Sequence, residues 1–314
     1  MVTRSSILLL CTLLVSAGPA AAQKQQESAA TVVQRTIPVP ASGFIRIFQL
    51  TGSVRVEGWD RDSVALNGTV IVPAAGEFVV TPGKQGAKIS LWGPDETQAP
   101  PSQLVVRVPR RSQLWIKTQS ANVEVADFEG SLDIVTIAGQ TQVSGRPREV
   151  YIESMGGSVT LALDTRSARI KTGTGAVTLR GNIQDLTVSS VSGAVTVQDV
   201  QLRQAHFESV DGPIRFLGAL NEPAALEFIN HSGDIELALT PGSMADFRVT
   251  TVSGAFRDEW GIRPASTTVN TRGASTKLGG KEFGFLVGGE GVADISIRNF
   301  KGAVILRRLP ARMP

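Results

Sequence analysis

A small residue recurs every 18 residues through the middle of the chain, with apolar residues at fixed offsets on both sides of it. The small residues are Ala121, Gly139, Gly157, Gly175 and Gly193, and the series continues at slightly wider spacing with Gly212, Gly233 and Gly254. A fixed period of about 20 residues is typical of stacked coils, each of which buries its apolar stripe only against its neighbours. Most of the chain is therefore expected to build a rod.

Apolar residues stand seven and five positions before the small residue, and two and four positions after it. Around Gly193 these are Leu186, Val188, Val195 and Val197, with polar residues between them. Alternation with a period of two predicts two short strands per coil, each with one buried face. The same template fits Ile45–Val56 and Ile295–Leu306, so we expect about ten coils in all.

The position three before the small residue always holds a small hydrogen-bonding side chain. These are Thr118, Thr136, Ser154, Thr172, Ser190, Ser209, Asn230 and Thr251. One interpretation is a stacked ladder in which each side chain bonds the turn backbone at a corner of the coil. The other is a row of nucleophiles, but no general base accompanies them, so the structural interpretation is preferred.

These features predict an all-β fold, a single-stranded parallel β-solenoid with coils of 18–21 residues that spans residues 35–310. The third side of each coil varies in length, which favours a right-handed winding, as does the general handedness of parallel crossovers. Strand-rich insertions interrupt the series at about 57–110 and 259–294. Because the end coils of a solenoid expose unpaired strand edges, we expect these insertions to help close the ends.

The N-terminus has the pattern of a cleaved secretory signal over residues 1–22: Arg4, the apolar run from Ile7 to Val15, and Ala20-Ala21-Ala22 before Gln23. Residues 23–34 are polar and are expected to form a flexible leader. The only cysteine, Cys11, lies within the signal. The mature chain has no second apolar stretch long enough to cross a bilayer, so no transmembrane anchor is expected. The predicted location is the periplasm, the cell surface or the medium.

The chain carries a formal net charge of +3 without a long basic run, which argues against a nucleic-acid partner. There are two histidines: His206 at an outward strand position and His231 at a corner. The residues show no metal-ligand spacing and no clustered carboxylates. We therefore expect no catalytic residue, no metal site and no cofactor.

Two motifs carry a resemblance to a known family. They are the coil motif Ser192-Gly193-Ala194-Val195-Thr196-Val197, with variants from Ser232 and Ser253, and the strand Leu104-Val105-Val106-Arg107-Val108-Pro109 before the regular coils. Together with the export signal, they resemble the large bacterial family of β-strand-repeat proteins of unknown function labelled "putative adhesins". The resemblance covers roughly Ile45 to Arg307. It implies a β-solenoid outside the cytoplasm and brings no catalytic residues.

Stacked coils would gather aromatic and cationic side chains on one outward strand face. The possible ligand-facing residues are Trp115, Lys117, Tyr151, Arg169 and Lys171, and an ordinary solvated face is the alternative interpretation. Asp133 and Glu153 neighbour each other there, but nothing in the sequence marks them as a catalytic pair.

The expected function is an exported, non-enzymatic structural or binding module of the cell envelope, with an unknown envelope protein or a glycan as partner. The alternative is a β-helix that binds or processes polysaccharide through the Trp115/Tyr151/Arg169 face. A third is a periplasmic scaffold or sensor that binds a protein through an exposed end coil.

Overall fold

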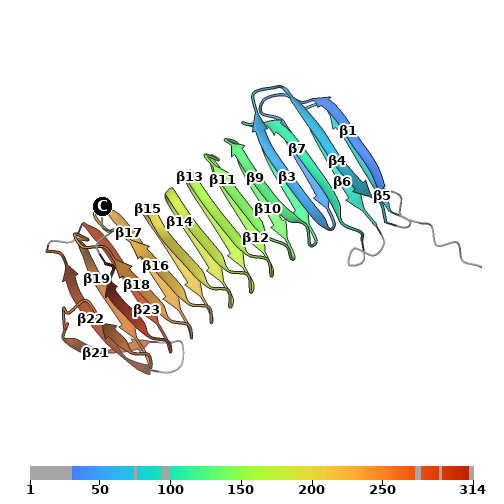
Figure 1. The fold of residues 1–314 in the computed structure, drawn as a ribbon. Helices are drawn as coiled ribbons and strands as arrows, with labels where there is room; N and C mark the ends of the chain where they lie inside the picture. Colours follow the sequence, from blue (N-terminus) through green and yellow to red (C-terminus); the bar gives the residue numbers. More distant parts are fainter. Residues whose placement is uncertain (1–29, 74–75, 94–98, 273–276, 290–291, 311–314) are drawn as a thin grey trace, which may run out of the picture.

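The protein is an elongated stack of β-strands. The computed structural model describes residues 30–73, 76–93, 99–272, 277–289 and 292–310. In these ranges every regular element is a strand, and the 24 strands form one mostly parallel sheet. The strands lie side by side from the N-terminal end of the body to the C-terminal end (Figure 1). The expected all-β parallel fold is confirmed, whereas the expected signal peptide, residues 1–22, lies outside the described residues.

Two ladders of parallel strands run through the body. The first ladder contains, in spatial order, β6 (Gly86–Trp92), β2 (Phe44–Gln49), β8 (Gln113–Thr118), β10 (Ser131–Thr136), β12 (Glu149–Ser154), the C-terminal halves of β13 (Val159–Thr172), β14 (Val177–Ser190) and β15 (Val195–Ser209), then β17 (Ala224–Asn230), β23 (Ala293–Asn299) and β19 (Ala245–Thr251). The second ladder contains β7 (Ser102–Pro109), β3 (Gly52–Trp59), β9 (Asn122–Phe128), β11 (Thr141–Gly145), the N-terminal halves of β13, β14 and β15, then β16 (Ile214–Gly218), β18 (Ile235–Leu239), β24 (Val304–Arg308) and β20 (Phe256–Asp258).

The core consists of the apolar template positions of both ladders. Leu186 and Val188 in the first ladder are 3% and 0% exposed, and Val195 and Val197 in the second are both 0% exposed. Their polar neighbours along the strands are more exposed. The predicted inward positions are therefore confirmed, and each strand contributes buried apolar area only because its neighbours cover it.

The recurring glycine is required by close packing of the backbone. A Cβ atom on Gly157, Gly175 or Gly193 would overlap the carbonyl oxygen of the small residue one repeat earlier. Among the regular repeats, Gly139 is the one that also has a left-handed φ, at 96°. Backbone conformation alone would tolerate other residues at most of these corners, but the approach of neighbouring repeats leaves no room for a side chain.

The hydroxyl ladder at the corner is structural, as expected. Ser154 Oγ donates to the carbonyl of Gly157 at 2.8 Å, Thr172 Oγ1 to that of Gly175 at 2.9 Å, and Ser190 Oγ to that of Gly193 at 2.7 Å. The side chains at this position are buried from Thr118 to Thr251. Each bond satisfies a corner carbonyl that would otherwise be buried without a partner.

The spatial order of the strands departs from the chain order at both ends. β23 lies between β17 and β19, and β24 lies between β18 and β20. The last template match therefore lies inside the stack. At the other end, β6 and β7 continue the ladders beyond β2 and β3. The region expected as an insertion at 57–110 thus supplies one strand to each ladder, β6 to the first and β7 to the second. Its alternating apolar residues are buried in the same core.

Antiparallel strands close the ends of the stack. β1 (Ala30–Pro38) pairs with β4 (Ser63–Ile71), which pairs with β7, and β5 (Glu77–Gly83) pairs with β6. At the C-terminal end β22 (Lys277–Val287) joins β19 to β21 (Ser266–Arg272). Antiparallel strands thus cover the ends of the ladders at β6, β7 and β19, as expected, whereas β20 pairs only with β24 in the described residues. Residues 30–34, expected within the flexible leader, instead belong to β1, whereas 23–29 lie outside the described residues.

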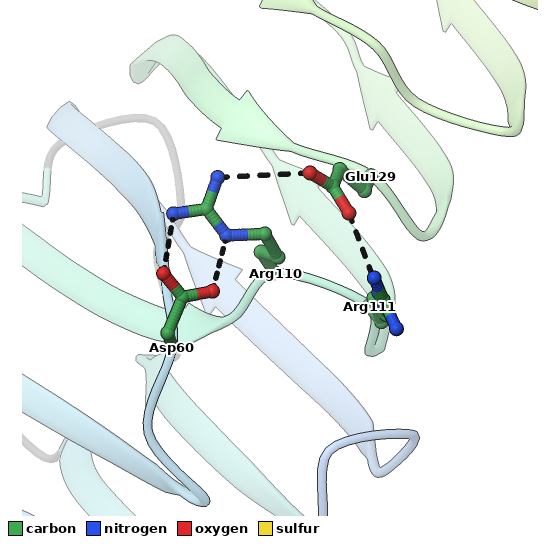
Figure 2. Close-up of polar contacts among 4 residues, drawn as sticks. All are labelled: Asp60, Arg110, Arg111 and Glu129. Carbon is green, nitrogen blue, oxygen red and sulfur yellow. Dashed lines mark hydrogen bonds and ion pairs between the residues drawn. The ribbon is translucent and has the colours of Figure 1, made fainter.

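Ion pairs connect three neighbouring strand ends near the N-terminal end (Figure 2). Arg110, which follows β7, donates to Asp60 after β3 at 2.7 and 3.1 Å and lies 3.7 Å from Glu129 after β9. Arg111 lies 3.4 Å from the other Glu129 oxygen. The hydrogen bond that Arg110 donates to Asp60 raises the pKa of Arg110 above its usual range. Since Asp60 and Arg111 are largely exposed and Arg110 and Glu129 are partly exposed, the pairs contribute little stability individually, and they connect the ends of the neighbouring strands β7, β3 and β9.

Candidate functional site

The outward face of the first ladder holds the predicted ligand-facing residues in two parallel rows. Trp115, Asp133, Tyr151 and Arg169 lie opposite one another on four adjacent strands. The second row lies two residues further along each strand and contains Lys117, Val135, Glu153 and Lys171. The structure therefore brings together every residue that the sequence proposed for this face.

A depression of about 700 Å³ lies over the first row. Trp115, Asp133, Tyr151 and Arg169 line it, and Phe44 and Arg46 of β2 extend it. Lys117 and Lys171 are exposed on the same strands but do not line it. We call this depression, with its six named lining residues, the Trp115 groove.

The aromatic side chains of the Trp115 groove are held by their neighbours. The Trp115 ring stands edge-on to Phe48, with centroids 5.0 Å apart and planes at 88°. The Tyr151 hydroxyl donates to Glu153 at 3.0 Å. Both side chains are only half-buried, so each presents part of a fixed ring to a ligand.

Asp133 lies between the two aromatic side chains and has an unsatisfied acceptor. Its Oδ1 is buried and has no hydrogen-bond partner in the described part of the chain. Burial, with a smaller contribution from the charge of Glu153, raises the pKa of the Asp133 carboxyl. Buried acceptors are normally paired, so a ligand donor would be favoured here if the carboxyl turned this oxygen toward the depression.

The raised pKa of Asp133 predicts a pH-dependent gain in stability for Asp133→Asn. A carboxyl whose pKa is raised by folding stabilises the protein below its unfolded pKa of about 3.9, and this contribution is lost as pH rises through the folded pKa. The variant should therefore melt at a higher temperature than the wild type at pH 7 and at the same temperature near pH 3. Calorimetry at both pH values tests this. Asp164→Asn, at an exposed position of β13, is the control, and an equal shift in both variants would contradict the assignment.

A second depression of about 790 Å³ continues along the same face from Arg169 toward the C-terminal end. It includes His206, whose Nδ1 lies 3.0 Å from Glu227, and Glu227 also accepts from Arg298 at 2.6 Å. Because Ser167 and Arg169 line both depressions, the two together follow the first ladder across most of its length.

The remaining candidates for chemistry have structural roles. His231 stacks on Phe300 at the corner, with centroids 4.9 Å apart and planes 12° from parallel. The described ranges contain no group of three or more His, Cys, Asp or Glu side chains that could hold a metal ion. They also contain no helix long and apolar enough to span a membrane.

The outward face of the second ladder carries paired charges near both ends. Glu57 accepts from Arg55 at 3.0 Å and from Arg107 at 3.1 Å, and these bonds lower its pKa, with Arg107 the larger cause. Near the other end, Glu236 lies 3.4 Å from Arg215 and 3.2 Å from Arg307. A smaller depression of about 300 Å³ lies on this face over β3, β7 and β9, so the two outward faces differ in the size of their depressions.

Sequence reasoning missed the contribution of β2 to the groove. Arg46 lies opposite Trp115, and Phe48 lies opposite Lys117. The signal was present, since Ile45 and Ile47 match the apolar template and place Arg46 at the position of Trp115. The long intervening segment concealed that β2 and β8 are neighbours.

The fold and groove define a repeat protein of stacked parallel strands whose largest described depressions lie on the first ladder. The sequence profile of the family described as "Toastrack DUF4097" matches residues 79–272. The chain belongs to this family, an uncharacterised bacterial family labelled "putative adhesin". A search of curated proteins finds no match.

Solved structures are similar to this chain at low sequence identity. A "putative lipid binding protein" from Parabacteroides distasonis ATCC 8503 is 11% identical with a TM-score of 0.50, and the match covers 89% of this chain and 97% of that one. A "putative adhesin" from Bacteroides fragilis NCTC 9343 is also 11% identical, with a TM-score of 0.44 and coverage of 90% and 99%. At this identity the first similarity shows a shared fold only.

Proposed function

We propose that this protein is an exported, non-enzymatic binding module of the bacterial cell envelope that binds its ligand along the outward face of the first ladder. The observation that carries the proposal is the pair of adjoining depressions on that face, with half-buried aromatic side chains and arginines around them. Ligand sites are concave surfaces with a few convergent polar groups, and a strand ladder holds such groups rigidly. The family label "putative adhesin" agrees with a binding role.

The export part of the proposal depends on the N-terminal sequence. Arg4, the apolar run Ile7–Val15 and Ala20-Ala21-Ala22 have the order of a cleaved signal. The mature chain would then begin at Gln23 in the periplasm, on the cell surface or in the medium. Within this proposal the ladders are sides of a right-handed solenoid of about ten coils, following the usual handedness of parallel crossovers.

The non-enzymatic part depends on how the reactive side chains are engaged. The corner hydroxyls of Ser154, Thr172 and Ser190 donate to corner carbonyls. His231 stacks on Phe300, and Glu153 accepts from Tyr151. Hydrolysis of a glycosidic bond needs a carboxyl pair, one member acting as acid and the other as nucleophile or base. On this face Glu153 already has a partner, so the arrangement favours binding over processing.

A binding experiment on isolated bacterial envelopes tests the proposed function. Labelled mature protein, residues 23–314, is expected to bind envelopes, and Arg46→Glu/Arg169→Glu should weaken this binding at least tenfold by reversing two groove charges. Arg166→Glu, an exposed arginine of β13 outside both depressions, is the matched control. Cell fractionation of the full chain gives the location. Equal envelope binding by both variants, or a full-length chain retained in the cytoplasm, would contradict the proposal.

A further inference from the structure

We propose that the Trp115 groove is a subsite for a linear polysaccharide that lies across the strands, parallel to the long axis of the body. Trp115 and Tyr151 would stack on the apolar faces of sugar rings, and Asp133 would accept a hydrogen bond from a sugar hydroxyl between them. The inference rests on the proposed function and adds the chemical class of the ligand.

The spacing of the aromatic side chains fits an extended chain of rings. Trp115 and Tyr151 occupy the same outward position with one strand, β10, between them. Two strand spacings place them roughly 10 Å apart along the stack. A polysaccharide presents its rings in a row, so one chain laid across the strands can contact both platforms. A single sugar ring reaches only one of them.

The unpaired acceptor favours a ligand rich in hydroxyl groups. Among the residues that the structure describes, Asp133 Oδ1 is buried without a partner, and its side chain lies between two aromatic ones. An unsatisfied buried acceptor is costly, and a turn of the carboxyl toward the depression would let a ligand hydroxyl donate to this oxygen and remove that cost in the bound state. One bound polysaccharide can place the apolar faces of its sugars on the Trp115 and Tyr151 rings and direct a hydroxyl toward the Asp133 carboxyl.

The charges around the groove favour an uncharged or weakly charged polysaccharide. Arg46 and Arg169 line its two ends, while Asp133 and Glu149 line its middle. A strongly anionic chain would meet these carboxyls, and a cationic one would meet the arginines. The mixed charge is suited to hydrogen bonding with hydroxyls, in which arginines donate and carboxylates accept.

The pairing of the strands disfavours a peptide as the ligand. β8, β10 and β12 each have a hydrogen-bonded neighbour on both sides. A protein segment therefore cannot add to them as an extra strand, the mode in which main-chain bonds supply affinity. Recognition in the Trp115 groove therefore depends on its outward side chains and not on main-chain hydrogen bonds.

Calorimetric titration with defined oligosaccharides tests the inference. The probes are chitohexaose, cellohexaose and solubilised peptidoglycan glycan strands, each compared with its disaccharide. We expect the mature protein to bind at least one hexasaccharide or glycan strand at least tenfold more tightly than the disaccharide. Trp115→Ala/Tyr151→Ala should weaken that binding at least tenfold, and Asp133→Asn several-fold. Trp92→Ala, an exposed tryptophan that does not line the groove, should leave it unchanged.

The outcomes separate this inference from the proposed function. Equal glycan affinity in Trp115→Ala/Tyr151→Ala and Trp92→Ala, with melting temperatures of both variants near that of the wild type, would overturn the inference. Absence of glycan binding, together with envelope binding that Arg46→Glu/Arg169→Glu removes, would overturn it too and would leave the proposed function standing with a protein or lipid ligand. Absence of both kinds of binding would overturn both.

Discussion

Val195→Asp is expected to abolish cooperative folding. Val195 is 0% exposed in the middle of the stack, between Val177 of β14 and Ile214 of β16. An unpaired carboxylate buried there costs several kcal/mol, and every neighbouring repeat unit depends on the contact. Total stabilities of folded proteins are only about 5–15 kcal/mol. Thermal and urea unfolding followed by circular dichroism should therefore show no sharp transition.

Thr196→Asp is the matched control for this variant. Thr196 is the next residue of β15, points to the outward side and is partly exposed. A carboxylate there remains in contact with water, so the transition should stay close to that of the wild type. A normal melt of Val195→Asp would contradict the inward assignment of this strand.

Removal of residues 292–314 is expected to detach the C-terminal end of the stack. The deletion removes β23 and β24, which separate β17 from β19 and β18 from β20. The side chains of Ile295, Ile297, Val304 and Leu306 are at most 2% exposed. At 1.5–3 kcal/mol for each buried side chain, the lost burial is about 6–12 kcal/mol, comparable to the whole stability of a typical domain.

Hydrogen exchange measures this effect locally. In the shortened chain the amides of β17 to β20 should lose protection, while those of β10 to β14 keep it, because repeat units contact mainly their neighbours. A chain that ends at Pro310 retains β23 and β24 and is the control. Undiminished protection of β19 in the shortened chain would contradict the observed strand order.

The ladders of buried residues were predictable because one physical requirement repeats along the chain. Each repeat must bury two apolar residues before the corner and two after it, and positions such as Ile170 and Val188 recur at the same offsets. The corner hydroxyls were predictable for the same reason, since every repeat has a carbonyl that needs a donor. The alternation within one repeat is a weak predictor of burial, and its recurrence at the same offsets makes the prediction possible.

The order of the strands at the ends was not predictable from the repeat. Leu226 pairs with Ile295, which in turn pairs with Phe247. All three are apolar and face the core, so any two of them could be neighbours and still be buried. The apolar pattern predicts which residues are buried, but it does not predict which strands lie next to each other. Contacts outside the template, such as those of Arg110 with Asp60 and Glu129 at the N-terminal end, accompany the observed order but do not recur from repeat to repeat.

The third side of the repeat was expected to be irregular, but β13, β14 and β15 continue through it as strands. Ile183, on this side, is 0% exposed and lies opposite Thr165 and Leu202. The alternation is hard to follow in the sequence because the register shifts between Leu179 and Gly181, where Gly181 has a φ of 109°. A bulge of this kind changes which residues face inward.

The groove was only partly predictable. The 18-residue period places Trp115, Tyr151 and Arg169 in one row, which the structure reproduces. The buried, unpaired oxygen of Asp133 depends on how its neighbours pack, and the contribution of Arg46 depends on the strand order at the N-terminal end. Neither property can be predicted from the sequence of a single repeat.

The interposed β23 and β24 also restrict where the length of this molecule can change. Both ends are fixed by segments that return from elsewhere in the chain, whereas the middle repeats from Gly139 to Gly193 succeed one another in order. One additional copy of an 18-residue middle repeat would lengthen the body by about 4.8 Å and leave both ends intact. The molecule is in this sense an adjustable spacer, whose reach is set by the number of its central repeats.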